Sequence, residues 1–171
     1  MAMHEIFTIG YGGRHRDEFI DLLKRHEIKV LVDVRSKPDR AFMHVFTRPH
    51  LSKHLPAEGI AYVFLGDSLG GYPSDEDCFV NGRLSASRCE ERDWYQNGIA
   101  RLKALAREKR VAIMCAERDP ENCHRSFVVG ATVTKDADFA IQHIDMAGEL
   151  VPHDALEVES KPRQLDMQVL L

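Results

Sequence analysis

Reactive side chains are concentrated in one segment of the chain, from Met114 to Ser126. The segment holds two thiols, an imidazole, two guanidiniums and three carboxylates. It follows the apolar run 111–114, which predicts a buried strand, and precedes the apolar run 126–133, which predicts a helix. In α/β proteins, a polar loop between a strand and a helix is the usual place for a ligand site. The segment therefore predicts a functional site, although it does not name a reaction.

The two thiols of this segment are candidate nucleophiles. Cys123 falls in the first turn of the predicted helix, where the helix amino end and the nearby Arg118, His124 and Arg125 favour a thiolate. Cys115 lies where the predicted strand leaves the sheet, close to the same helix start. Either cysteine could attack a substrate, or the two could form a redox pair. The alternative is that both are small buried apolar residues, as free cysteines often are.

Metal binding is a weaker hypothesis for the same segment. Its candidate ligands are Cys115, Cys123, His124 and His143. Structural zinc sites usually show closely paired cysteines, and this chain has no C-x-x-C pair. We therefore predict no metal ion, and the sequence identifies no cofactor.

Three arginines, Arg35, Arg118 and Arg125, are predicted at loop or helix-start positions on one side of the sheet. Guanidinium forks suit carboxylates and phosphates, so a small anionic ligand such as a nucleotide or a phosphorylated metabolite is the expected partner. Glu117 and Asp33 are the acid/base candidates of an enzyme with this site. The alternative is that these carboxylates pair with the arginines and only hold the loops in place.

Glycines follow the first predicted strand, in Gly10-Tyr11-Gly12-Gly13. Glycine lets a backbone approach a ligand closely, so Gly10 and Tyr11 are candidate ligand contacts, with a tight turn as the alternative. The spacing is not that of a dinucleotide-binding G-x-G-x-x-G motif.

Aromatic and basic residues alternate from Arg40 to Arg48, and Phe42 and Phe46 could stack a nucleic-acid base. The net charge of -4 offers no general attraction to nucleic acid or to an anionic membrane. We therefore favour a role for Phe42 and Phe46 in covering the core, and we keep a nucleotide or nucleic-acid binding module as a second hypothesis.

Apolar periodicity predicts an α/β fold: a single domain with an open, mainly parallel sheet flanked by helices, loosely rhodanese-like or Rossmann-like. The predicted strands are 6–9, 30–34, 61–65, 111–115 and 140–144, and the predicted helices are 15–26, 48–55, 93–108 and 120–135. Right-handed crossovers place the carboxyl ends of all the strands on one side. The candidate residues above follow these ends, so we expect them to converge.

The length of 171 residues suits one domain, which we assign to residues 1–158. Residues 66–92 are predicted to be a long loop or insertion, and the tail 159–171 is expected to be disordered or to bind a partner. No apolar run approaches the roughly 20 residues that span a membrane, so we expect no membrane partner. No secretory signal is evident, so we expect a cytoplasmic protein with reduced cysteines. The oligomeric state is not indicated.

Several short motifs resemble the bacterial domain-of-unknown-function family 488 over about residues 6–157. They are Thr8-Ile9-Gly10, Leu31-Val32-Asp33-Val34-Arg35, Leu69-Gly70-Gly71, Met114-Cys115-Ala116-Glu117, Cys123-His124-Arg125 and His143-Ile144. The resemblance implies a compact α/β domain and leaves the activity unassigned. The positions that mark the family correspond here to Gly10, Asp33, Arg35, Gly70, Gly71, Cys115, Glu117, Cys123, His124 and Arg125.

The chain departs from the family pattern in one loop. Arg40-Ala41 stands where members commonly carry Ser-Arg, and His44 replaces a proline. A looser likeness to rhodanese-type sulfurtransferases would make Cys115 a persulfide carrier, but Arg125 lies farther from Cys115 than that analogy requires. Three hypotheses remain: an enzyme with a thiol or acid/base site, a binding module, and a structural polar network.

Overall fold

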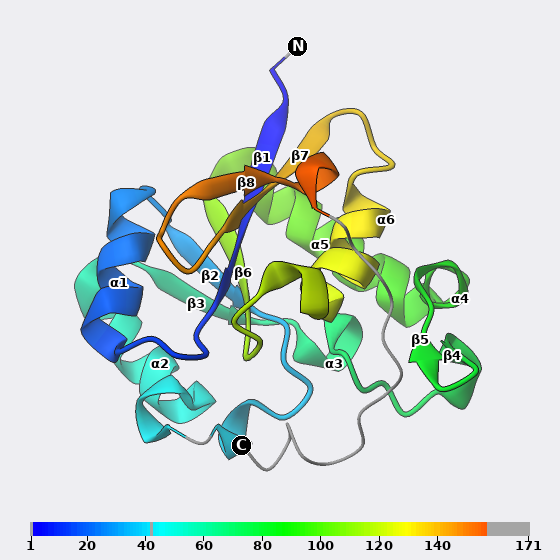
Figure 1. Cartoon of the computed structure of the whole chain (residues 1–171), viewed down its shortest axis with the longest axis horizontal. Coiled ribbons are helices and arrows are strands. Elements are labelled where there is room, and N and C mark those ends of the chain that lie inside the picture. The colour runs from blue at the N-terminus through cyan, green and yellow to red at the C-terminus, as the bar shows by residue number, and fades with distance from the viewer. Residues whose placement is uncertain (1, 42, 157–171) are drawn as a thin grey trace.

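The central strands carry apolar side chains on both faces, so the sheet must be covered on both sides. In strand β6 (Val111–Cys115), Val111 and Ile113 belong to one apolar cluster and Ala112 and Met114 to the other. The computed structural model, which describes residues 2–41 and 43–156, shows the resulting layers of helix, sheet and helix (Figure 1).

The main sheet has six strands in the order β3-β2-β6-β1-β7-β8. Besides β6, these strands are β1 (His4–Gly10), β2 (Val30–Asp33), β3 (Ala61–Phe64), β7 (Phe139–Ile144) and β8 (Leu150–Pro152). All pairs are parallel except β7 with β8. This arrangement confirms the predicted α/β class with its mainly parallel sheet. The edge strand β8 was missed because it is short and partly exposed.

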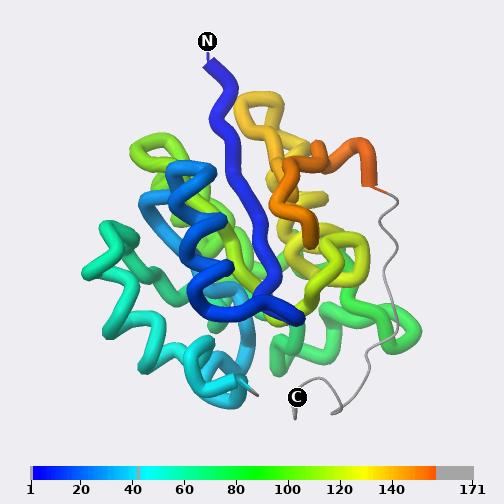
Figure 2. Tube along the Cα trace, turned by 60° about the vertical axis from the view of Figure 1, so that its left-hand side comes forward, coloured from blue at the N-terminus to red at the C-terminus, as the bar shows by residue number. Residues whose placement is uncertain are grey.

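Two helices on each side cover the sheet, and Figure 2 shows α1 beside β1 in a second view. The helices α1 (Arg16–Arg25) and α2 (Arg48–His54) pack on the face that carries Phe7 and Leu31. The opposite face is covered by α5 (Asp93–Glu108) and by the helical segment that ends in α6 (Ala131–Val133). Among the described residues, no helix is long and apolar enough to cross a membrane.

Residues 66–92, predicted to be a loop or insertion, contain short elements rather than a bare loop. They form α3 (Gly66–Leu69), the hairpin β4 (Phe79–Val80) and β5 (Arg83–Leu84), and α4 (Ala86–Glu90). These elements are too short for a periodic apolar pattern to show. This segment also holds the 3₁₀ turn Glu76–Cys78, and further 3₁₀ turns of the chain cover Pro38–Arg40, His44–Phe46, Leu55–Glu58, Pro120–Asn122 and His153–Ala155.

The predicted helix 120–135 was wrong at its start. Pro120–Asn122 forms only a 3₁₀ turn, and Cys123 then has an extended backbone, with φ -120° and ψ 143°. The continuous helix begins after Cys123 as a π-helical turn, Arg125–Gly130, and leads into α6. The proline and the acidic residue after Asp119 are equally suited to a 3₁₀ turn, so the local sequence could not separate the two structures. The predicted tail, 159–171, lies outside the described residues.

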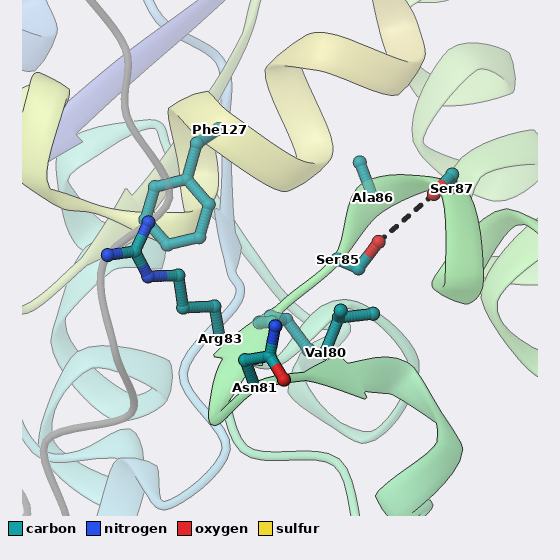
Figure 3. A pocket seen from close by; sticks show the side chains of 8 residues that line it. Val80, Asn81, Arg83, Ser85, Ala86, Ser87 and Phe127 are labelled. Atoms are coloured by element: carbon teal, nitrogen blue, oxygen red, sulfur yellow. Dashed lines mark hydrogen bonds between the residues drawn. The ribbon is translucent and has the colours of Figure 1, made fainter.

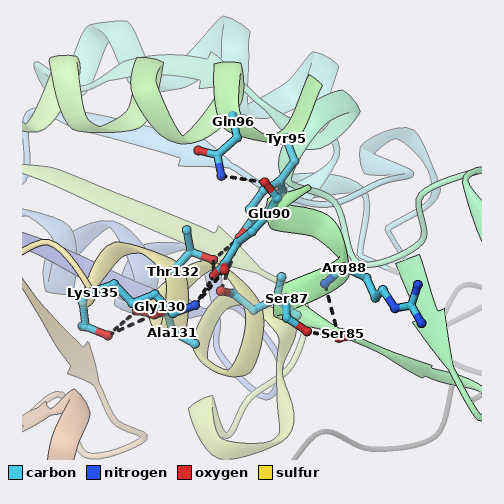
Figure 4. Close-up of polar contacts among 12 residues, drawn as sticks. Ser85, Ser87, Arg88, Glu90, Tyr95, Gln96, Gly130, Ala131, Thr132 and Lys135 are labelled. Atoms are coloured by element: carbon cyan, nitrogen blue, oxygen red, sulfur yellow. Dashed lines mark hydrogen bonds and ion pairs between the residues drawn. The ribbon is translucent and has the colours of Figure 1, made fainter. Parts of the chain in front are cut away.

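A polar network anchors α4 to the segment that follows Cys123 (Figure 4). Glu90 accepts hydrogen bonds from Thr132 Oγ1 at 2.8 Å and from Lys135 Nζ at 2.7 Å. The hydroxyl of Tyr95, at the start of α5, lies 2.8 Å from Thr132 Oγ1. Glu90 therefore ties residues 66–92 to the helix that supports the cysteine loop.

We expect Glu90→Ala to lower the free energy of unfolding by about 1–3 kcal/mol, because hydrogen bonds to a charged group contribute about that much. Glu91→Ala is the matched control, since Glu91 is exposed at the end of the same helix. We expect that control to stay within about 0.5 kcal/mol of the wild type. Equal urea midpoints for the two variants would contradict the anchoring role.

Candidate functional site

Strand register brings the reactive segments together at one edge of the sheet. Gly10 at the end of β1 pairs with Cys115 at the end of β6, and Asp33 at the end of β2 pairs with Met114. The expected convergence is thus present in the backbone, because parallel neighbours end at the same side. The side chains that follow these strands decide what the edge can do.

Three side chains form a buried cluster at this edge: Cys115, Cys123 and His124. The Nδ1 atom of His124 lies 3.7 Å from the sulfur of Cys115 and 3.7 Å from the sulfur of Cys123. Cys115 is 7% exposed, whereas Cys123 is only 1% exposed. Cys123 has an extended backbone and precedes the helix. The two thiols, expected near one helix start, both lie next to the His124 imidazole.

The orientation of the His124 ring is set by the backbone of β2. Its Nε2 lies 3.0 Å from the carbonyl oxygen of Val34, which can only accept, so Nε2 carries a proton. In the neutral ring, Nδ1 is then bare and can accept from either thiol. Gly71 lies against the same ring, because a Cβ there would be 2.9 Å from Nδ1. Gly71, one of the positions that mark the family resemblance, therefore leaves room beside the cluster.

The two thiols have opposite pKa shifts because they share one site. Burial raises the pKa of Cys123, but the Cys115 thiol, Arg125 and His124 together hold that pKa well below its usual range. The neighbouring Cys123 sulfur and burial raise the pKa of Cys115 well above its usual range. The cluster therefore favours one thiolate and one thiol, with the negative charge on Cys123 and the proton on Cys115.

Asp33 is fully buried, and its carboxylate is fully engaged. Oδ1 accepts from Arg35 Nε at 2.9 Å and Oδ2 from Arg35 Nη2 at 2.8 Å. The Tyr62 hydroxyl also donates to Oδ2. Burial and the charge of Asp33 raise the pKa of Tyr62, so its proton stays on the hydroxyl. Asp33, predicted as an acid/base candidate, is thus arranged to hold Arg35 in place.

Arg35 keeps one donor unused. Its Nη1 is buried and has no hydrogen-bond partner among the described residues. Burial would lower the pKa of Arg35, but the hydrogen bonds and charge of Asp33 raise it above its usual value, so the guanidinium is charged. It lies over the ring of Tyr11, 5.3 Å from the centroid. The backbone N–H of Tyr11 donates to the carbonyl oxygen of Cys115 at 3.2 Å, so the guanidinium over the Tyr11 ring lies at the same edge of the sheet as Cys115.

One of the two aromatic rings considered for base stacking, that of Phe46, lies in the core, as we favoured from the sequence. Phe46 is fully buried and stacks on Tyr11, with ring centroids 4.6 Å apart. This confirms a core role for Phe46 and removes one support of the nucleic-acid hypothesis. Phe42 lies outside the described residues.

Arg125 is a scaffold for the loop after β6. It is fully buried, and it donates to the carbonyl oxygen of Glu117 at 2.8 Å and to Thr8 Oγ1 at 3.3 Å. The loop also lies directly on β1: a Cβ at Gly10 would be 1.8 Å from the Glu117 oxygen. Gly10 and Arg125, both predicted as ligand contacts, are therefore used to shape this loop.

Arg118 and Glu117, also predicted as site residues, lie in the loop after β6 and are exposed or partly exposed. The Arg118 side chain is 56% exposed and pairs with Asp119 at 3.6 Å. Glu117 is partly exposed. Both could approach a ligand above the cluster, and their predicted roles in anion binding and acid/base catalysis stay predictions.

Sequence reasoning missed a buried chain of polar side chains beneath the site. Thr8 Oγ1 lies 2.6 Å from His143 Nδ1, and His143 Nε2 lies 3.0 Å from His153 Nδ1. His143, weighed as a metal ligand, is thus engaged elsewhere and is not part of the cysteine cluster. Buried Arg14, which donates to the carbonyl oxygen of Gly10 at 2.9 Å, was also missed. No spacing rule identifies the contact of Thr8 with His143, because the chain brings these distant residues together only on folding.

An open hollow of about 640 Å³ lies away from these residues, beside the β4–β5 hairpin (Figure 3). It is lined by Phe127, from the helix after Cys123, and by hairpin residues such as Arg83 and Leu84. None of the reactive side chains described above lines it. The cysteine cluster and this hollow are therefore separate features of the structure.

Comparison with known protein families matches residues 15–132 to the family described as "Domain of unknown function DUF488". The chain belongs to the DUF488 family. The matched range includes the cysteine cluster and Arg35 of this DUF488 protein. Neither the curated proteins nor the solved structures contained a match.

We expect Gly10→Ala to destabilise the DUF488 protein by about 3 kcal/mol or more, because the new methyl group would overlap backbone and force the loop to move. Gly59→Ala is the control: the space around Gly59 is open, but its φ of 77° is left-handed. We expect the control to cost about 1–2 kcal/mol. Denaturant unfolding measures both, and a Gly10→Ala cost no greater than the control would contradict the close packing of the loop.

Stability should also depend on the protonation of His143. Burial, His153 and Arg125 lower the pKa of His143 to about 3, whereas its ordinary value is 6.5. As the pH falls, His143 is therefore protonated in the unfolded chain before it is protonated in the folded protein. The stability that depends on neutral His143 is complete above pH 6.5 and is lost as the pH falls toward 3. Between about pH 7 and pH 4.5 we expect a loss of about 3 kcal/mol, at about 1.4 kcal/mol per pKa unit.

Urea unfolding at those two pH values measures this loss, with His143→Gln as the comparison. The variant should be less stable at neutral pH but should lose about 3 kcal/mol less on acidification. Equal pH dependence in both proteins would show that His143 is not the group responsible.

Proposed function

We propose that this DUF488 protein is an enzyme that uses the Cys115–Cys123–His124 cluster to act on a small anionic substrate. The observation that carries the proposal is the position of His124 Nδ1, 3.7 Å from each of two sulfurs that lie apart in the sequence. Burial of two apolar thiols does not require a ring nitrogen between them. A nucleophile beside an oriented base is, in contrast, the arrangement that thiol catalysis uses.

The three side chains would have distinct roles. His124 is the base, because the Val34 carbonyl holds its ring and leaves Nδ1 free to accept a proton. Cys115 is the sulfur that meets the substrate, because it is the more exposed of the two. As Cys115 attacks, its proton passes to His124 Nδ1 or to the Cys123 thiolate, so that the negative charge moves to the more exposed sulfur.

Arg35 would bind the negative charge of the substrate. Asp33, which also accepts from the Tyr62 hydroxyl, fixes the guanidinium from one side, and Nη1 remains as a buried donor without a partner among the described residues. Charge-assisted hydrogen bonds of this kind are strong in buried surroundings. The exposed Arg118 could steer an anion inward, with Glu117 as a second acid/base candidate. The four cysteines are free, which suits the expected cytoplasmic setting.

Two alkylating reagents that differ mainly in charge test the proposal in one experiment. Iodoacetamide is neutral and iodoacetate is anionic, and mass spectrometry resolves the labelling of each cysteine. We expect Cys115 to react with both reagents faster than the buried Cys78 and Cys89 do. We also expect iodoacetate to be favoured at Cys115 by about tenfold relative to a free thiol, since a charge-assisted hydrogen bond contributes about 1.5–3 kcal/mol.

Arg35→Gln should remove the preference for iodoacetate, whereas Arg118→Gln, at an exposed position, should reduce it only slightly. Arg35→Lys keeps the charge and should retain part of the preference. If Cys115 reacts only when the protein unfolds, together with Cys78, the cluster is a packing feature and the proposal is wrong. If Cys115 reacts in the folded protein without any preference for iodoacetate, the thiol role stands and the anion role fails.

A further inference from the structure

We infer that Cys115, Cys123 and His124 also form a binding site for a zinc ion, with three protein ligands and a fourth position open to water or an anion. A regulatory role for this ion rests on the proposed function, because an ion bound to both sulfurs would block the nucleophile. The binding of zinc itself is argued from the geometry alone.

The first argument is the spacing of the ligand atoms. A tetrahedral zinc ion, with Zn–S of about 2.3 Å and Zn–N of about 2.0–2.1 Å, separates its sulfur and nitrogen ligands by about 3.6 Å. In the DUF488 protein both sulfurs lie 3.7 Å from His124 Nδ1. All three ligand atoms lie within 4.8 Å of one another. The two sulfur–nitrogen distances therefore match a bound zinc ion closely, and the two sulfurs are near enough to reach it with small side-chain adjustments.

The second argument is the state of the imidazole. A zinc-bound histidine coordinates through a bare nitrogen and usually donates its other N–H to a carbonyl or carboxylate. His124 meets both conditions, because Nε2 donates to the Val34 carbonyl oxygen at 3.0 Å and Nδ1 faces the sulfurs. Gly71 has no side chain, which leaves room beside the histidine ligand. A Cβ at this position would lie 2.9 Å from Nδ1.

The third argument is the chemistry of the donor set. Two sulfurs and one imidazole nitrogen suit zinc and exclude the oxygen-seeking Mg²⁺ and Ca²⁺ as preferred ions. Two thiolates also neutralise Zn²⁺, so the loaded site could stay buried without a net charge. Three protein ligands with an open position are typical of zinc sites that bind a substrate or water, whereas structural sites have four.

Occupancy would then divide the protein into two forms. In the metal-free form the thiols can react, and in the metal-loaded form both sulfurs are ligands. The second pair of cysteines, Cys78 and Cys89, provides an internal comparison: its two sulfurs are also in contact, but they belong to no group of three candidate ligands among the described residues. Metal should thus affect one cysteine pair and leave the other unchanged.

The test uses the reduced full chain, freed of metal by a chelator and titrated anaerobically with Co²⁺. We expect one ion per chain, with sulfur-to-cobalt charge-transfer bands and the strong visible bands of a tetrahedral site, and displacement by Zn²⁺. Cys123→Ser and His124→Gln should each weaken binding at least tenfold, while Cys89→Ser should leave it unchanged. Zn²⁺ should also slow the alkylation of Cys115 in the wild-type protein at least tenfold, a readout that needs no variant.

The outcomes separate the two proposals. If Co²⁺ gives no sulfur charge-transfer bands, and Zn²⁺ leaves Cys115 reactive, the zinc site is refuted and the thiol function stands. If the bands appear unchanged in Cys123→Ser, the metal binds elsewhere and the inference is again wrong. If the bands depend on Cys123 but Cys115 of the metal-free protein is inert, the zinc site stands and the thiol function fails.

Discussion

The buried guanidinium of Arg125 is the interaction on which the site depends. It lies at the start of the helical segment and donates to Thr8 on β1 and to the Glu117 carbonyl of the loop after β6. One side chain thereby joins a strand, a loop and a helix whose residues are far apart in sequence. Its positive charge is the counterpart of the thiolate that the cysteine pair favours, because it lowers the pKa of Cys123. Without this charge, both the loop and the thiolate would lose their support.

Buried arginines have an architectural role at this edge of the sheet. Arg14 donates to the carbonyl of Gly10, and Arg125 donates to that of Glu117, so both hold backbone that would otherwise leave polar atoms unpaired. Arg35 differs, because Asp33 occupies only part of its guanidinium and leaves Nη1 without a partner among the described residues. An arginine that the sequence identifies as a ligand group can thus either support the backbone or bind a ligand. The donors that it does not use within the protein distinguish the two roles.

The dithiol cluster combines two kinds of chemistry that compete for the same atoms. A sulfur that coordinates a metal is a weaker nucleophile than a free thiolate, and a sulfur that has lost its proton is suited to both uses. The carbonyl of Val34 favours either use, because it leaves Nδ1 of His124 bare. All three side chains of the cluster are buried, and Cys115 is the more exposed of the two cysteines, so whatever reaches Cys115 would decide which chemistry occurs.

The sequence alone determined the fold class, most strands and helices, and the edge at which the site lies. Periodic apolar residues specify strands and helices locally, and right-handed crossovers place the strand ends together. It also identified Cys115, Cys123 and His124 as reactive candidates. The helix start was misplaced because a proline and acidic residues suit a 3₁₀ turn as well as an α-helix.

Only the tertiary structure decided what each candidate touches. Asp33 became the support of Arg35, Gly10 and Arg125 became loop scaffold, and Phe46 joined the core. The physical reason is that a hydrogen bond depends on distances of a few tenths of an ångström between residues that the chain brings together only on folding. Residue type and spacing show which groups are present at an edge, but the donors and acceptors left unpaired there depend on every neighbouring strand.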